Sequence, residues 1–303
     1  MAPDQPSHPE PAAHARPTVA CIGLGALGEP MALNLLQAGY AVTVHNRHPR
    51  RHAALLQAGA AAAATPAEAA AQAPLLLVCV SDDAAVEAVL LEQPQAAIAG
   101  LRPGALVIDC STISPATSRR VAQRLARQGI DYIDAPVTGG TEGARAGSLS
   151  VLVGGEPEAV ERAQPLLQVI GQRISHFGAV GAGQEAKAVN QVLVAGSYAA
   201  VAEALALAER LGLDRPQLIE ALRGGAAGSW ALEHRSGRML NDHYPLGFRL
   251  ALHRKDLAIA LAAAADQGLE LPISQRVAAM EDTLISAGHG DEDVSVLARW
   301  FRG

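Results

Sequence analysis

The chain has 303 residues, enough for about two domains of ordinary size, and half of them are hydrophobic, so the protein can build a sizeable core. Its 24 basic and 30 acidic residues give a net charge of −6, which argues against a protein that binds nucleic acid through a basic surface. No run approaches the ~20 apolar residues of a membrane span, and no signal peptide stands out, so we expect no membrane partner. Cys21, Cys79 and Cys110 lie in apolar runs and are too few for a disulfide framework, which favours buried thiols in a cytoplasmic protein.

The first part of the chain is typical of a doubly wound α/β domain. Residues 1–17 are rich in proline and are expected to be a disordered tail, whereas from residue 18 to about 180 apolar runs alternate with helical stretches. Near-continuous apolar runs predict a parallel sheet that is covered on both faces. The predicted strands are Thr18–Ile22, Ala41–His45, Leu75–Val80, Ala105–Asp109, Ile130–Asp134, Leu149–Val153 and Arg173–Phe177. Helices are expected at Ala26–Ala38 and Pro115–Gln128, and the Ala-rich stretch at 58–64 favours helix.

Residues 181–303 are expected to form an all-α domain. It begins with one long helix, Gln184–Leu211, in which no charged side chain occurs from Ala188 to Ala202. A helix so apolar on all sides is buried in a domain core or in a subunit interface. Proline and glycine then divide the rest of the chain into further helices. These breaks lie at Pro216, Gly224-Gly225, Pro245 and Pro272.

A glycine-rich turn follows the first predicted strand and opens a helix. It reads Gly23-Leu24-Gly25-Ala26-Leu27-Gly28. In this position the glycines allow a tight turn, close approach of a pyrophosphate and close helix–strand packing, and the helix N-terminus faces the phosphates. A plain glycine-rich turn is the alternative, but the second strand also ends where a dinucleotide-binding fold requires it. The turn therefore predicts a nicotinamide cofactor.

The end of the second predicted strand indicates which nicotinamide cofactor is bound. An enzyme that uses NAD places an acid there, and one that uses NADP places arginine. The segment contains Asn46, Arg47 and Arg51, and no acid occurs between Tyr40 and Ala67. These residues predict NADPH in preference to NADH, the alternative being a solvated basic helix start.

Lysine is almost absent from the chain. Only Lys187 and Lys255 occur among the 24 basic residues. A lysine ammonium loses its proton near neutrality when it is buried, which a guanidinium does not do. The two lysines are thus candidates for proton transfer, although chance or codon bias would also leave two.

Four segments in order resemble the β-hydroxyacid dehydrogenase family, which contains 3-hydroxyisobutyrate dehydrogenase, tartronate semialdehyde (2-hydroxy-3-oxopropionate) reductase and glyoxylate/succinic semialdehyde reductase. The resemblance covers residues 18 to about 300, with a leucine in the opening signature where methionine is common and threonine at 138 where serine is commoner. The segments are Gly23–Ala32, Asp134–Gly140, Gly181–Gln191 and Leu252–Leu257. The family implies an NAD(P)-linked oxidoreductase acting on a CH–OH group.

The resemblance and the chemistry assign Lys187 as the general acid/base. Near the start of an apolar helix, desolvation lowers an ammonium pKa toward neutrality, so Lys187 can donate a proton to the alkoxide in reduction and accept one in oxidation. Asn190 and Gln191, at i+3 and i+4, share its helical face and can bind substrate or orient the ammonium. A solvated surface lysine is the alternative.

Other site residues follow from the resemblance and from their place in the fold. Thr138, Gly139 and Gly140 offer N–H groups and a hydroxyl for a substrate carboxylate, unless they form a plain loop. The resemblance assigns Lys255 to the cofactor, with an ion pair to Asp256 as the alternative. Further cofactor contacts are expected at Val80, Ser81 and Thr112, and further pocket walls at Trp230 and Phe248, which could equally be core residues. The ten histidines show no metal-ligand spacing, so no metal is expected.

The function predicted is an NADPH-dependent reductase of a small aldehyde acid, of the 2-hydroxy-3-oxopropionate, glyoxylate or succinic semialdehyde type. The alternatives are a 3-hydroxyisobutyrate-type NAD(P) dehydrogenase and a non-catalytic NADPH-binding protein. Imine reductases share the architecture but generally lack the lysine, and 6-phosphogluconate dehydrogenase has a longer second domain. The long apolar helix predicts a homodimer or a homotetramer.

Overall fold

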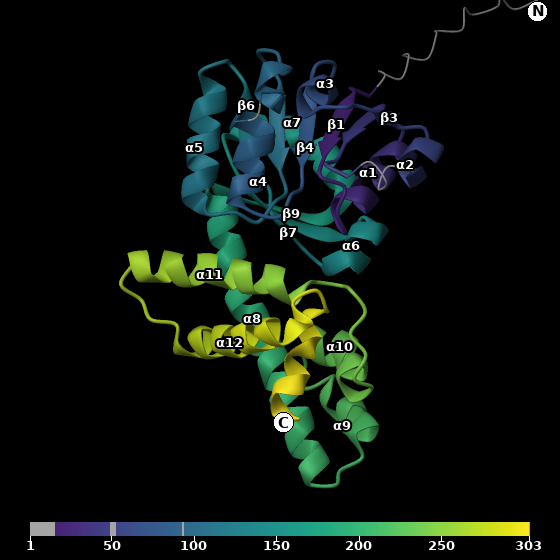
Figure 1. Cartoon of the computed structure of the whole chain (residues 1–303), viewed down its shortest axis with the longest axis vertical. Coiled ribbons are helices and arrows are strands. Elements are labelled where there is room, and N and C mark those ends of the chain that lie inside the picture. The colour runs from purple at the N-terminus through teal and green to yellow at the C-terminus, as the bar shows by residue number, and fades with distance from the viewer. Residues whose placement is uncertain (1–15, 49–52, 93, 303) are drawn as a thin grey trace, which may run out of the picture.

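The computed structural model describes residues 16–48, 53–92 and 94–302. A sheet-containing half ends with strand β9 (Gly171–Gly178), and a helical half starts with helix α8 (Ala182–Arg210). Figure 1 shows the two halves one above the other, with α8 running from beneath the sheet down through the helical half. Apart from residues 16 and 17, the tail predicted for residues 1–17 lies outside the described residues.

The sheet is mostly parallel and has the predicted doubly wound order. Its other strands are β1 (Val19–Ile22), β2 (Val42–His45), β3 (Ala61–Ala62), β4 (Leu75–Val78), β5 (Leu106–Asp109), β6 (Asp131–Asp134), β7 (Val137–Thr138) and β8 (Leu149–Gly154). The order is β3-β2-β1-β4-β5-β6-β8-β7, with β9 beside β8. The strands from β3 to β6 are parallel, and β8 runs antiparallel to β6 and β7. The chain reverses its winding between β1 and β4, which is where such folds bind ligands beyond the carboxyl ends of the strands.

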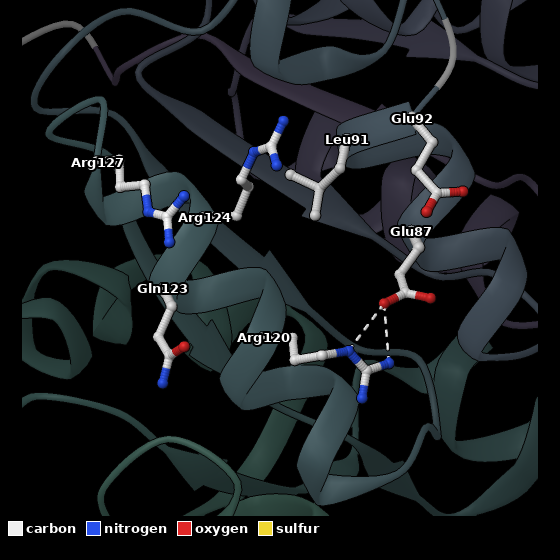
Figure 2. Close-up of a pocket in the computed structure, with 7 residues that line it drawn as sticks. All are labelled: Glu87, Leu91, Glu92, Arg120, Gln123, Arg124 and Arg127. Carbon is white, nitrogen blue, oxygen red and sulfur yellow. Dashed lines mark hydrogen bonds and ion pairs between the residues drawn. The ribbon is translucent and has the colours of Figure 1, made fainter.

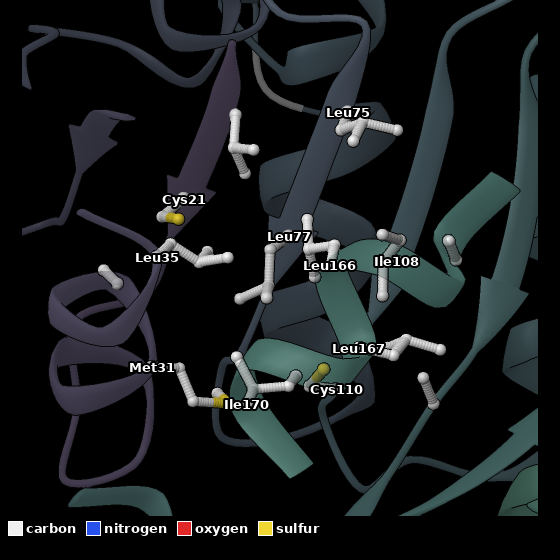
Figure 3. Close-up of a cluster of buried hydrophobic side chains, with 14 of the residues drawn as sticks. Cys21, Met31, Leu35, Leu75, Leu77, Ile108, Cys110, Leu166, Leu167 and Ile170 are labelled. Carbon is white, nitrogen blue, oxygen red and sulfur yellow. The ribbon is translucent and has the colours of Figure 1, made fainter. Parts of the chain in front are cut away.

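Helices cover both faces of the sheet because successive strand residues point to opposite faces. They are α1 (Gly28–Gln37), α2 (Ala53–Gln57), α3 (Pro66–Ala70), α4 (Asp83–Glu87), η2 (Ala88–Glu92), η3 (Ala97–Ala99), α5 (Pro115–Ala126), α6 (Gly140–Ala146) and α7 (Pro157–Ile170). Figure 3 shows one face, where Met31 of α1 and Ile170 of α7 pack with Cys21 and Cys110. On the other face, Ala20 and Ile22 join a second apolar cluster with residues of α3 and α5. The expectation of buried thiols is confirmed for Cys21 and Cys110, whereas Cys79 is half-buried.

Two short strands contradict the sequence-based expectation. The Ala-rich stretch at 58–64 is not helical, since Ala61 and Ala62 form β3 and pair with β2. Gly59, at φ +99°, takes the chain out of α2, and the free edge of β2 then outweighs the helix propensity of alanine. The second missed strand, β7, is only two residues long and follows Pro136, too short for any periodicity to be visible.

The helical half is built around α8. The other helices are α9 (Arg215–Leu222), α10 (Trp230–Leu240), α11 (Leu250–Asp266), α12 (Pro272–Leu284), η4 (Ile285–His289) and η5 (Val294–Phe301). Pro216 and Pro272 lie in the first turns of α9 and α12, where a missing N–H costs nothing. Helices α10, α11, α12 and η5 all pack against α8, and Ala195, Tyr198 and Ala202 of α8 contribute to the apolar core.

Only one face of α8 is buried within this chain, so the domain core accounts for only part of the burial expected of this helix. Val189, Leu193 and Leu207 expose 65%, 70% and 61% of their surface. By length and composition alone, α8 is also the one helix among the described residues that could cross a membrane, so the expectation that no such run exists is wrong. Its packing against four other helical segments is that of a core helix, whereas its opposite face is exposed to solvent within this chain.

Candidate active site

The glycine-rich turn has the geometry of a dinucleotide cradle. Gly23 has φ +92°, and a Cβ there would lie 2.2 Å from the carbonyl oxygen of Cys79. A Cβ on Gly28 would lie 1.9 Å from the carbonyl oxygen of Gly23, so only glycine lets α1 approach the turn. A Cβ on Gly25, by contrast, would meet nothing within 4 Å. The outer glycines thus serve close packing, and the middle one leaves the backbone open to a pyrophosphate.

Asn46 braces this turn against the end of β2. Its Oδ1 accepts a hydrogen bond from the N–H of Leu24 at 3.1 Å, and its Nδ2 donates to the carbonyl of His48 at 3.1 Å. Both ends of the amide are therefore engaged by the protein, which makes Asn46 a residue that shapes the turn. Arg47 is exposed next to it. Arg51 lies outside the described residues.

The residues predicted after the third and fourth apolar runs lie at the carboxyl edge of the sheet. Val80 donates its N–H to Oγ of Ser111 at 2.9 Å, which joins the segments that follow β4 and β5. Ser81 is exposed and hydrogen-bonds Asp82 at 2.7 Å. The carbonyl of Thr112 accepts a hydrogen bond from the ammonium of Lys255 on α11. The helical half thus reaches the same sheet edge as the glycine-rich turn.

Lys187 is buried in the second turn of α8, with 5% of its surface exposed. Burial lowers the pKa of its ammonium from 10.5 to about 8, and the carboxylate of Asp256 partly opposes this effect. The start of α8 is held firmly to the sheet, because Gln184 donates from Nε2 to the carbonyl of Ser111 at 2.8 Å and Asp134 accepts from the N–H of Gly181 at 2.7 Å. The helix start therefore fixes the lysine next to the sheet edge.

Asp256 is a functional candidate that sequence reasoning considered only as an ion-pair partner. It is buried and lies 2.8 Å from the ammonium of Lys255 through Oδ1. Its Oδ2 accepts a hydrogen bond from Nε2 of Gln191 at 2.8 Å, and Gln191 in turn accepts from Nδ2 of Asn190 at 2.7 Å. Both lysines, Asn190 and Gln191 are thus gathered around one carboxylate. The sequence signals for Asp256 were its place directly after Lys255 and within the segment Leu252–Leu257 that resembles the family.

The predicted substrate loop connects β7 to α6. Gly139 and Gly140 have φ of +130° and +65°, so two successive left-handed residues follow Thr138. A turn of this kind can offer backbone N–H groups to a carboxylate. The loop contacts the helical half, because Glu142 of α6 accepts a hydrogen bond from Arg235 of α10 at 2.8 Å.

The two aromatic residues predicted as pocket walls differ in burial. Phe248 is partly buried and packs on the helical core, with its ring 5.5 Å from that of His253, which favours the core alternative. Trp230 begins α10 and keeps 43% of its surface exposed, with the Arg235 guanidinium 4.4 Å from its ring centre. Trp230 is therefore the one that remains available to a ligand.

A cavity on the surface of the described structure lies apart from these residues. The cavity has a volume of about 560 Å³. Its lining residues come from α5 and the residue after it and from the segment 87–92 (Figure 2). It is lined by Glu87, Leu91, Glu92, Arg120, Gln123, Arg124 and Arg127. An ion pair between Arg120 and Glu87 at 2.8 Å crosses it. None of the predicted site residues lines it.

Comparisons with known proteins agree with this geometry. The family described as the NAD binding domain of 6-phosphogluconate dehydrogenase matches residues 18–178, and that described as NAD-binding of NADP-dependent 3-hydroxyisobutyrate dehydrogenase matches residues 181–301. The 2-hydroxy-3-oxopropionate reductase of Escherichia coli is 38% identical over 278 residues, 92% of this chain and 94% of the reductase. The NAD-dependent L-serine dehydrogenase of Pseudomonas aeruginosa is 37% identical over 290 residues, 93% of this chain and 97% of that protein.

A solved structure extends the similarity to three dimensions. Mycobacterium tuberculosis 3-hydroxyisobutyrate dehydrogenase with L-serine superposes with a TM-score of 0.84 at 33% identity, covering 95% of this chain and 99% of that one. Fold, cofactor cradle and relatives together define an NAD(P)-binding oxidoreductase that acts on CH–OH groups. The chain belongs to the β-hydroxyacid dehydrogenase family, as the sequence resemblance indicated.

Proposed function

We propose that the protein is an NADPH-dependent reductase of a small aldehyde acid, working reversibly as a β-hydroxyacid dehydrogenase. The observation that carries this proposal is Lys187, a buried ammonium whose pKa of about 8 lets it exchange a proton near neutrality. A bound nicotinamide supplies or accepts the hydride. Lys187 gives its proton to the carbonyl oxygen as the aldehyde becomes an alcohol, and takes it back in oxidation.

The cradle residues support a dinucleotide, and the end of β2 supports NADPH. Gly23–Gly28 would hold the pyrophosphate, with Val80, Ser81, Thr112 and Lys255 along the same edge of the sheet. Arg47 is exposed beside the turn, where a guanidinium can form charge-assisted hydrogen bonds to a 2′-phosphate. No acid is present there to bind ribose hydroxyls as in NAD enzymes. One relative is named as NAD-dependent, so the preference needs a direct measurement.

The substrate class follows from the loop at Thr138. Its two glycines with positive φ can offer N–H groups to a carboxylate. The proposed proton donor, Lys187, lies on α8 with Asn190, which can bind the rest of the substrate. The names of the relatives, 2-hydroxy-3-oxopropionate reductase and L-serine dehydrogenase, fit three-carbon acids with a terminal oxygen function. Glyoxylate and succinic semialdehyde also carry one carboxylate and one aldehyde.

A panel of short aldehyde acids, each assayed with NADPH and NADH, tests the proposal, together with 3-hydroxyisobutyrate assayed with NADP⁺ and NAD⁺. We expect turnover of at least one aldehyde acid and a higher kcat/KM with NADPH. Oxidation of 3-hydroxyisobutyrate as the only reaction would support the dehydrogenase alternative. Binding of NADPH with no turnover of any acid would support a non-catalytic protein.

The protein is further proposed to be a cytoplasmic homodimer or homotetramer. The exposed leucine and valine side chains of α8 form the surface that a second copy would cover. Each Å² of apolar surface that a second copy buries would stabilise the assembly by about 20–33 cal/mol.

A further inference from the structure

A four-charge cluster joins the substrate loop to the helical half. Its members are Glu142 on α6, Arg235 and Arg238 on α10, and Asp293 before η5. Glu142 lies two residues after Gly140, whereas the two arginines are more than ninety residues further along the chain. The cluster lies outside the groups that handle the proton, and the reaction chemistry described above does not use it.

Glu142 divides its carboxylate between the two halves. Oε1 accepts hydrogen bonds from Arg235 at 2.8 Å and from Arg238 at 3.3 Å. Oε2 accepts from the hydroxyl of Thr141 at 3.2 Å and folds back over the loop, since a Cβ on Gly140 would lie 3.1 Å from it. One carboxylate therefore touches both the substrate loop and α10.

The other end of the cluster reaches both predicted aromatic walls. The guanidinium of Arg235 lies over the Trp230 ring at 4.4 Å. Asp293 is fully buried and accepts a hydrogen bond from the backbone N–H of Phe248 at 2.9 Å. It also forms ion pairs with Arg238 at 3.3 Å and Arg235 at 3.5 Å. The substrate loop, Trp230 and Phe248 are thus all in contact with the same four-charge cluster.

The charges of the network balance, two positive against two negative, so it has no surplus charge with which to bind an anionic substrate. Partial burial by itself raises the pKa of the Glu142 carboxyl, but its own backbone N–H and the Arg235 charge outweigh burial and hold that pKa below its ordinary value. Glu142 therefore stays ionised at neutral pH. Removal of its charge would leave Asp293 as the one carboxylate of the network against two arginines, of which Arg235 is only 3% exposed.

We propose that Glu142 is a positioning residue, which clasps the substrate loop to α10 through Arg235 and Arg238 and thereby fixes the carboxylate-binding backbone opposite Lys187. The inference rests on the proposed function for its kinetic consequence, but the clasp itself is a property of the protein alone. It explains how α6, a helix of only seven residues, is fixed to a helix in the other half of the molecule.

Glu142→Gln tests the clasp, with Asp131→Asn as control, because Asp131 forms an exposed ion pair with Arg162 within the sheet half. Losing a charge-assisted hydrogen bond should raise KM for the aldehyde acid on the order of tenfold or more, with kcat and the Kd for NADPH within about twofold of the parent protein. Asp131→Asn should leave all three unchanged. An unchanged KM would overturn the proposal. So would a loss of kcat/KM accompanied by a lower Tm and weaker NADPH binding, because that would indicate general damage to the fold.

Arg238→Gln, alone and combined with Glu142→Gln, provides an independent check. Arg238 is only half-buried, and in the double variant one positive and one negative charge remain, so the network is again balanced. The double variant should raise KM by less than the product of the two single effects, since both remove one interaction. A fully multiplicative loss would contradict the clasp. Hydrogen–deuterium exchange of segment 137–147 separates this inference from the proposed function: it should rise in Glu142→Gln and not in Asp131→Asn, whether or not any aldehyde acid is turned over.

Discussion

Gln191 and Asp256 share a hydrogen bond of 2.8 Å between buried side chains, although 65 residues separate them in the chain. The bond joins α8, which carries Lys187, to α11, which carries Lys255. Since Asp256 also forms an ion pair with Lys255 and its charge opposes the effect of burial on Lys187, one carboxylate interacts with both lysines of the protein. The position of Lys187 relative to the sheet edge is therefore set by two helices and not by α8 alone.

Lys187→Ala should reduce kcat by ~10²–10⁴-fold, because it removes the general acid. The Kd for NADPH should stay nearly unchanged, which fluorescence titration can measure. Lys187→Arg should be almost as inactive, since a guanidinium does not release its proton at working pH. Activity of either variant within a few-fold of the parent protein would contradict the assignment.

The rate of reduction should fall as pH rises through about 8. Burial lowers the pKa of Lys187 from 10.5 to about 8, so the ammonium that reduction needs is present below that pH and lost above it. Oxidation needs the neutral amine, and its rate should rise over the same range. Plots of kcat/KM against pH in both directions test this, and two flat profiles between pH 7 and 9 would exclude Lys187 as the titrating group.

Asp256→Asn should move this pH dependence to lower pH. The Asp256 carboxylate stabilises the ammonium of Lys187 and raises its pKa, so removing the charge should let the pKa fall further. Asp282→Asn, which alters an exposed ion pair with Arg254 on the adjacent helix, is the matched control and should leave the profile in place. A shift to higher pH in Asp256→Asn would mean that another charge dominates.

Arg47→Ala should weaken NADPH binding and spare NADH. A lost charge-assisted hydrogen bond costs roughly 1.5–3 kcal/mol, or about one to two decades in Kd. Arg127→Ala, an exposed arginine on the outer cavity, should change neither cofactor. Equal losses for NADPH and NADH in Arg47→Ala would show that this side chain does not contact the 2′-phosphate.

Light scattering at micromolar protein should give a mass at least twice the 31.2 kDa of the chain. Leu193→Glu places a charge in the middle of the exposed face of α8 and should shift the protein toward monomer. Leu56→Glu, on α2 of the sheet half, is the control for adding charge at an exposed leucine. A monomeric parent protein would refute the assembly.

The sequence predicted those features that depend on local pattern. Apolar runs located the long strands, and the glycine-rich turn located the cofactor cradle that Gly23 and Gly28 form by close packing. The scarcity of lysine, the apolar helix that follows Lys187 and the family resemblance of segment 181–191 together pointed to Lys187. Strand β3 could not be found in this way, because Ala61 and Ala62 form a strand only by pairing with β2. The Glu142–Arg235 contact could not be found either, because 93 residues separate its two partners in the chain.

Helix α8 is a structural member of both halves. At its start, the N–H groups of Gly181 and Gln184 satisfy the buried carboxylate of Asp134, at 2.7 and 2.8 Å, and further along Tyr198 enters the core of the helical half. Melting the helical half would therefore strip Asp134 of its donors and expose a flank of β8 and β9. Separate unfolding of the halves is thereby penalised, because each half would lose contacts that α8 makes with the other.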